Sequence, residues 1–322
     1  MTYTTRSTFF NNRLTKVTSI PNYATQWYSL RHNSNKATIQ NNGKECIPIE
    51  TIQLLSATTN DSIQTEFANA IRPYFLHQRP VLIKNYYQSF TPALQHWTRR
   101  EYLLEKVGAS THCSVEIGGS YSDLSIDRPE ITFGDFLHYM NLWEERHDLK
   151  GEDPRKEELV YMAQNDLNSL GDLVNDISFP EVTTDPKYDV GHGSAYNAMF
   201  WFGPRSCVSP LHYDPLDNLL VQIVGQKRVL LYPNRITERG DTIKDEDDHA
   251  LNWHYAGYDG QQYNTSPIDV ENPDFTQFGL FRHAPAAVEC LISPGDILYV
   301  PSKWWHHVRS LDTAISVNIW WR

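Results

Sequence analysis

The chain has 322 residues, 40% of them hydrophobic and 12% aromatic, which is enough to bury a sizeable core in one large domain, with or without an extension. Its formal net charge of -11 argues against generic nucleic-acid binding, because phosphate contacts need a basic surface, and favours a basic polypeptide as partner. No apolar run is long enough to cross a bilayer, so we expect no membrane partner.

The first 44 residues differ in composition from the rest of the chain. They contain no Asp or Glu, and they combine six Lys or Arg residues with many Ser, Thr and Asn. This composition predicts a polar, poorly ordered basic extension over residues 1–50. A mitochondrial transit peptide is the alternative, because such peptides are rich in Arg and Ser and poor in acidic residues.

The number and spacing of the cysteine residues indicate the redox state of the compartment in which the protein resides. None of the four stands at metal-ligand or redox spacing from another, and four thiols are few for a chain of this length. We therefore expect unbridged thiols in a reducing compartment, the cytoplasm or the nucleus.

Residues 51–156 have a mixed, partly helical pattern. Apolar periodicity and Gly turns predict a helix, a strand, a second helix, a second strand and a third helix, at residues 61–77, 80–87, 93–107, 114–121 and from 132 onward. The charged run from Glu144 to Glu158 is interpreted as a solvated loop. This part is expected to form the N-terminal side of the main domain.

Short β-rich segments dominate residues 157–322. They are separated by Gly, Pro and Asn, and their number and spacing predict a sandwich or a barrel. A polar, Asp-rich stretch from Arg235 to Asn272 interrupts them and is interpreted as a long surface insertion.

A candidate metal site lies among these strands. His212 and Asp214 are two residues apart, so in a strand both side chains leave the same face. His306 follows a Pro-Gly-Asp turn far downstream. Two histidines and one carboxylate are the ligand set of a non-haem Fe(II) oxygenase.

Each of these residues also has an ordinary structural interpretation. A His-x-Asp pair arises by chance in a chain with 13 histidines, and His306 could be a core histidine. His307 is a rival third ligand, because neighbouring residues of a strand face opposite ways and only one can reach the metal.

Lys227 is the second anchor of the site. It emerges between apolar strand residues, where burial is costly unless an anion pairs with the ammonium group, although a Lys at an exposed hairpin end would be unremarkable. In the last strand, Ser316, Asn318 and Trp320 share one face, which could line a ligand-holding barrel or face water.

These motifs together resemble the JmjC-domain 2-oxoglutarate oxygenases of the hydroxylase type. The resemblance covers roughly residue 61 to the C-terminus and is carried by residues 201–232 and 269–321. It is dense from residue 161 onward, thin before it, and absent in the first 44 residues. It implies a mainly β fold, a double-stranded β-helix (a cupin-like jelly roll) with N-terminal helices. The stretch 235–264 is longer and more acidic than the family pattern.

The resemblance also assigns residues. It makes His212, Asp214 and His306 the Fe(II) ligands and selects His306 over His307. It implies that the co-substrate 2-oxoglutarate is bound by Tyr161, Trp201, Ser209, Asn218, Lys227 and Asn318. It implies that the substrate contacts Glu116, Tyr121, Gln164 and Trp320.

The implied activity consumes 2-oxoglutarate and O₂, releases succinate and CO₂, and hydroxylates a protein side chain. An arginine is the favoured target, because the chain is acidic and a carboxylate such as Glu116 can pair with a guanidinium. An N-methyl-lysine demethylase and a tRNA wybutosine-type hydroxylase are the alternatives within the family. A non-enzymatic cupin-type scaffold is the alternative outside it.

Overall fold

The structure, a computed structural model, describes one compact unit, Thr38–Arg322, apart from several gaps. The described residues are 40–41, 43–54, 60–84, 86–87, 91–118, 128–150, 159–233 and 264–322. Tyr121 and most of the predicted extension and insertion therefore lie outside them. Within these ranges no helix has both the length and the apolar character needed to span a membrane.

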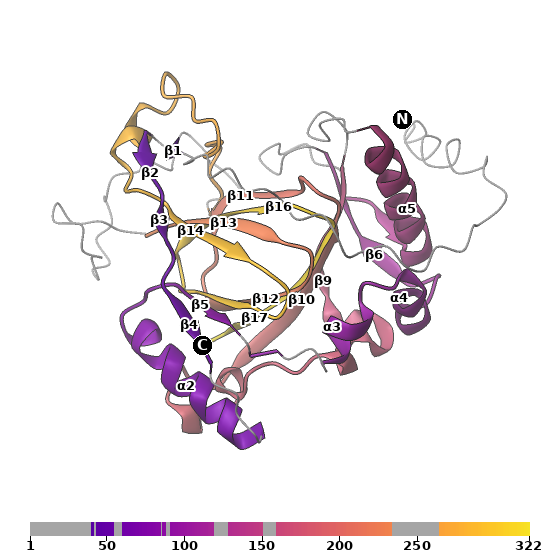
Figure 1. Ribbon diagram of the computed structural model, residues 1–322, viewed down its shortest axis with the longest axis horizontal. Helices are drawn as coiled ribbons and strands as arrows, with labels where there is room; N and C mark the ends of the chain where they lie inside the picture. The colour runs from indigo at the N-terminus through magenta and orange to yellow at the C-terminus, as the bar shows by residue number, and fades with distance from the viewer. Residues whose placement is uncertain are drawn as a thin grey trace, which may run out of the picture. The chain divides into compact units, whose positions relative to one another are not determined.

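Two β-sheets form the body of the unit (Figure 1). The larger has the strand order β4-β5-β15-β12-β17-β10-β9-β7, and the smaller has the order β11-β16-β13-β14-β3. The strands of the larger sheet are β4 (Thr51–Gln53), β5 (Val81–Lys84), β15 (Ile297–Val300), β12 (Asp217–Val224), β17 (Ala314–Trp321), β10 (Ala195–Gly203), β9 (Val160–Asp166) and β7 (Glu116–Ile117). Those of the smaller sheet are β11 (Val208–Tyr213), β16 (Trp305–Ser310), β13 (Lys227–Tyr232), β14 (Val288–Ile292) and β3 (Ile47–Pro48).

From β10 to β17 the chain crosses repeatedly between the two sheets. β12 and β15 pair in the larger sheet, and β13 and β16 pair in the smaller one. Apolar side chains from both sheets meet between them, among them Leu220, Leu298, Val229 and Val308. Two mainly antiparallel sheets packed on a shared apolar interior form the β-sandwich of a jelly roll.

The outer face of the smaller sheet is also buried. Leu230, Tyr232 and Trp305 pack there against Ile268 and Phe281 from the segment that precedes β14. The segment 264–272 is therefore part of the core, and its assignment to a surface insertion was wrong. Ile268 and Val270 point into the core and anchor this segment. The surrounding Asp, Glu and Asn residues make the segment look like a surface loop in the sequence.

The outer face of the larger sheet is covered by helices. α2 (Asn60–Leu76) brings Phe75 against Trp321, and α5 (Phe133–Lys150) brings Phe136 against Phe202. Figure 1 shows α2 on one flank and α3, α4 and α5 together on the other. The predicted N-terminal helices thus serve as a cover for one sheet.

Three predicted elements differ from those observed. The helix predicted over 93–107 is two helices, α3 (Pro92–His96) and α4 (Arg100–Val107), because the intervening Trp97 is buried and donates its indole N–H to Asp176. The strand predicted over 114–121 is split into β6 (His112–Ser114) and β7.

The third difference is the charged run after the third helix. α5 continues to Lys150, so the first residues of this run are helical rather than a loop. Glu144 pairs with Arg100 and accepts a hydrogen bond from Thr313, and these contacts fix the helix there. At its other end, Thr132 caps α5 by accepting a hydrogen bond from the Asp135 backbone N–H.

Two short stretches complete the described unit. A ribbon of β1 (Gln40–Asn41) and β2 (Lys44–Glu45) leads into β3 and β4, so residues predicted as part of the extension contribute to the sheets. β6 pairs with β8 (Glu130–Thr132). Between β9 and β10 and again before β14, the chain forms 3₁₀ turns, at Leu167–Ser169, Gly171–Asp176, Glu181–Thr183, Pro186–Tyr188 and Gly279–His283.

Candidate active site

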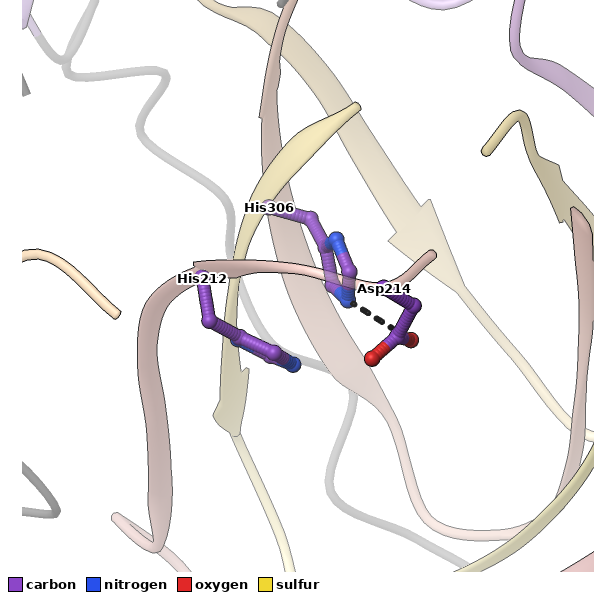
Figure 2. A group of neighbouring side chains, drawn as sticks. All are labelled: His212, Asp214 and His306. Atoms are coloured by element: carbon purple, nitrogen blue, oxygen red, sulfur yellow. Dashed lines mark ion pairs between the residues drawn. The ribbon is translucent and has the colours of Figure 1, made fainter. Parts of the chain in front are cut away.

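Three side chains converge at one end of the space between the sheets. His212 near the end of β11 pairs in register with His306 in β16, and Asp214 lies just beyond β11. Their ligand atoms lie within 4.8 Å of one another, and Figure 2 shows all three side chains pointing toward a common centre. Two imidazoles and a carboxylate in this arrangement form a facial set with room for further ligands on the metal.

His212 and His306 each use Nδ1 in a hydrogen bond to the backbone, which leaves Nε2 available as a metal ligand. Nδ1 of His212 lies 2.7 Å from the Pro210 carbonyl, and Nδ1 of His306 lies 2.9 Å from the Trp304 carbonyl. A carbonyl only accepts, so each Nδ1 carries the proton and each Nε2 presents its lone pair. This is the tautomer that a metal ligand requires.

The charge state of His306 suits the same role. Burial, assisted by the neighbouring His212 and opposed by Asp214, lowers its pKa to about 4. The imidazole is therefore neutral near pH 7. Its Nε2 lies 3.7 Å from Oδ2 of Asp214, which is close enough for one cation to bridge the two (Figure 2).

Two donors orient the Asp214 carboxylate. The Trp320 indole N–H donates to Oδ2 at 3.0 Å, and the Asn218 amide donates to the same oxygen at 3.3 Å. Hydrogen bonds of this kind fix the plane of a ligating carboxylate. Trp320 therefore touches a predicted metal ligand as well as lining the cavity.

Lys227 lies at the other end of the cavity and is 2% exposed. Its Nζ donates to the Ser316 hydroxyl at 2.6 Å and lies 3.5 Å from the Tyr161 hydroxyl. Burial lowers the pKa of Lys227 to about 7, and no carboxylate forms an ion pair with it among the described residues. An exposed hairpin end is thus excluded for this lysine, and an anion would be stabilised beside it.

One cavity contains both ends of the site. Its volume is about 480 Å³ when the open space at its mouth is included. The predicted residues that line it are Tyr161, Gln164, Trp201, Ser209, His212, Asp214, Asn218, Lys227, His306, Asn318 and Trp320. The sequence thus identified the polar lining, although the individual roles stay predictions.

The apolar part of the lining was not predicted. It consists of Leu220, Val229, Leu298, Val300 and Val308, which come from both sheets. Such residues look like ordinary core in the sequence, and only their alternation with outward-facing neighbours could have indicated them. Ser316 was placed on the right face, but its bond to Lys227 was not foreseen.

One predicted substrate residue, Glu116, is not part of the cavity lining, and another, Tyr121, lies outside the described residues. Glu116 in β7 pairs in register with Tyr161, and its carboxylate accepts a hydrogen bond from Arg128 at 3.1 Å. Burial raises the pKa of Glu116 to about 7 although Arg128 opposes the shift.

Comparison with known proteins identifies the kind of domain. Residues 67–322 match the family described as "Cupin-like domain". "Lysine-specific demethylase JMJ30" of Arabidopsis thaliana is 34% identical over 257 residues, covering 78% of this chain and 52% of that protein. "Jumonji C domain-containing protein 5" of Drosophila melanogaster is 32% identical over 282 residues, covering 85% of this chain and 63% of that protein.

A third relative belongs to another branch. "tRNA wybutosine-synthesizing protein 5" of Homo sapiens is 30% identical over 172 residues, covering 53% of this chain and 45% of that protein. The chain thus spans roughly half the length of these relatives.

The family match, the paired sheets and the His-Asp-His cluster make this chain a member of the cupin-like domain family. Within that family it is similar to proteins named for a Jumonji C domain, as the sequence predicted. The family and the fold class predicted from the sequence are confirmed.

Proposed function

We propose that this chain is an Fe(II)- and 2-oxoglutarate-dependent oxygenase that hydroxylates a protein side chain, with arginine as the favoured target. The proposal is carried by one observation: a single cavity has a three-residue ligand set at one end and a buried lysine at the other. A dicarboxylate that chelates a metal needs both features at once.

The residues at the first end fit Fe(II). His212, Asp214 and His306 would hold the ion through two neutral Nε2 atoms and one carboxylate, and mixed nitrogen and oxygen ligands suit this metal. When bound, Fe(II) supplies the oxidative chemistry in which 2-oxoglutarate and O₂ yield succinate, CO₂ and one oxygen atom for the substrate. The protein's own task is to keep the three ligands in place and to leave the remaining positions open.

The residues at the second end fit the distal carboxylate of 2-oxoglutarate. Lys227 would supply the charge, and hydroxyls of Tyr161 and Ser209 would donate hydrogen bonds to the same group. The carboxylate would in turn keep Lys227 protonated, which offsets the cost of burying the ammonium group. Asn218 and Asn318 would lie near the metal-chelating end, with Trp201 as a wall.

The substrate class is argued from charge. The chain carries a net charge of -11, and an acidic surface attracts a basic polypeptide and repels nucleic acid. Glu116 offers a largely buried carboxylate one strand away from the cavity wall, and its present partner is a guanidinium. An arginine-bearing peptide matches both features.

N-methyl-lysine demethylation is the second candidate, since three of the relatives carry the name of a lysine-specific demethylase. Both reactions insert oxygen into a C–H bond, and they differ in the fate of the hydroxylated carbon. A hydroxylated side-chain carbon that bears no nitrogen leaves a stable alcohol, whereas a hydroxylated N-methyl group is lost as formaldehyde.

The test uses the full chain with Fe(II), ascorbate and 2-oxoglutarate. An arginine-rich peptide library, the same library with N-methyl-lysine, and a tRNA pool are incubated in parallel and examined by mass spectrometry, with succinate measured in each. Gain of one oxygen on arginine supports the proposal. Methyl loss from lysine or oxidation of tRNA alone would replace the substrate class, and no succinate in any arm would overturn the oxygenase.

A further inference from the structure

A directed row of hydrogen bonds runs across three neighbouring strands and ends on Asp214. The Trp201 indole N–H in β10 donates to Oδ1 of Asn318 in β17 at 2.6 Å. The Asn318 amide donates to Oδ1 of Asn218 in β12 at 3.1 Å. The Asn218 amide then donates to Oδ2 of Asp214 at 3.3 Å.

The direction of this row is fixed at its far end. An indole N–H can only donate, so Asn318 must turn its oxygen toward Trp201 and its NH₂ toward Asn218. Asn218 must then turn its oxygen toward Asn318 and its NH₂ toward Asp214. One donor therefore sets the orientation of two amides and decides that Asp214 faces a donor rather than an oxygen.

Because these residues are buried, the Trp201 N–H determines the orientation of both amides. Trp201, Asn218 and Asn318 are each 9% exposed or less, so little water is present to satisfy a reversed amide. In such surroundings an unpaired polar group is costly, and linked hydrogen bonds strengthen one another. The far end of the row also borders the Lys227 end of the cavity, because Trp201 packs against Tyr161 with ring centroids 5.9 Å apart.

We propose that Trp201, Asn318 and Asn218 act as positioning residues that orient the Asp214 carboxylate for metal binding. The inference rests on the metal site of the proposed function. Its specific content is that Trp201, which is separated from Asp214 by two side chains, controls metal affinity through the two amides. Groups that support a metal ligand in this way commonly change affinity by about 10- to 100-fold when removed.

The test measures metal binding rather than turnover. Co(II) and Mn(II) affinities are determined by titration for wild type, Trp201→Phe, Asn218→Ala and the double variant, together with the visible absorption of the Co(II) forms. Trp201→Phe keeps an aromatic ring and removes the N–H, and we expect it to bind metal about 10-fold more weakly with a shifted Co(II) spectrum.

The double variant distinguishes an effect of Trp201 that is transmitted through Asn218 from two independent effects on packing. Once Asn218 is removed, Trp201 has no route to Asp214, so the double variant should bind metal as weakly as Asn218→Ala and no more weakly. Trp143→Phe is the matched control, because Trp143 belongs to the same apolar cluster as Trp201 and forms no part of the row. It should keep wild-type affinity and spectrum at a similar loss of thermal stability.

The outcomes distinguish this inference from the proposed function. Wild-type affinity in Trp201→Phe, or losses that multiply in the double variant, would overturn the positioning role while the metal site stands. Absence of metal binding by the wild type itself would overturn the proposed function.

Discussion

His306 and His307 are neighbours in β16, yet they lie on opposite faces of the five-stranded sheet. His306 faces the cavity, and its imidazole lies beside that of His212 with ring centroids 4.1 Å apart. His307 is buried on the outer face, where burial lowers its pKa to about 4 and the charge of Glu271 opposes the shift. Because successive side chains of a strand point to opposite faces, only one of these adjacent histidines can face the cavity.

This relationship predicts a contrast between two alanine variants. His306→Ala should lose stoichiometric Mn(II) binding, because it removes one of three ligands. His307→Ala should retain Mn(II) binding and lose about 1–3 kcal/mol of folding stability through the space left behind. Metal titration and urea unfolding of both variants check this, and loss of metal binding in His307→Ala would contradict the assignment of the two faces.

Lys227→Met should abolish 2-oxoglutarate binding and leave the metal site intact. The substitution keeps most of the side-chain volume and removes the charge that faces the cavity. Removing one partner of a buried charge pair typically costs about 2–5 kcal/mol of binding. Calorimetric titration with 2-oxoglutarate in the presence of Mn(II) measures this loss, and a retained Mn(II) affinity shows that the fold is preserved.

The same lysine predicts a pH dependence of stability without co-substrate. Burial lowers the pKa of Lys227 from 10.5 to about 7, so the unfolded chain holds more protons between these two pH values. Stability relative to Lys227→Met should therefore rise with pH over this window. Urea unfolding of both proteins at pH 7 and pH 9 tests the sign, and a constant difference would show that Lys227 does not titrate in this range.

Gly203→Ala should weaken 2-oxoglutarate binding through Tyr161. A Cβ atom at this position would lie 2.6 Å from the Tyr161 ring and 2.9 Å from Sγ of Cys207, so the ring must move. We expect about a 10-fold rise in Kd for 2-oxoglutarate, corresponding to about 1.4 kcal/mol. Gly279→Ala is the control, since nothing lies within 4 Å of its added Cβ, and equal affinities in the two variants would contradict the role of Tyr161.

Glu271→Gln should destabilise the fold more than Glu289→Gln. Glu271 bridges Arg228 and Arg309, all three with side chains no more than 20% exposed, whereas Glu289 pairs with Arg228 alone and is 36% exposed. Breaking a buried pair costs about 3–5 kcal/mol, and partial exposure reduces this to about 2–3 kcal/mol. The exposed pair should cost less than about 1 kcal/mol, as urea unfolding would show.

Local patterns predicted much of the fold and of the cavity. Alternation in the C-terminal strands placed Ser316, Asn318 and Trp320 on one face, and the structure finds Asn318 and Trp320 lining the cavity. Spacing within one strand brought His212 and Asp214 together. These features depend on residues close in sequence, whose relative orientation the backbone geometry dictates.

Contacts between distant segments escaped prediction. Glu271 is buried because it pairs with Arg228 and Arg309. These partners lie 43 and 38 residues away in the sequence, so no local pattern could predict them. The break between α3 and α4 likewise depends on Asp176, which receives the Trp97 indole N–H. Strand parity alone left His306 and His307 open and the family resemblance chose His306; the register of β16 against β11 supplies the physical reason.

The short pairing of Thr265 with His212 has a consequence for how a polypeptide can approach. β11 is the outermost strand of its sheet, and an exposed strand edge is a ready template for another chain. The backbone of residues 264–266 already takes up the backbone hydrogen bonds of Leu211 and Tyr213, on either side of His212. An extended polypeptide therefore cannot pair with the edge of β11 at this point.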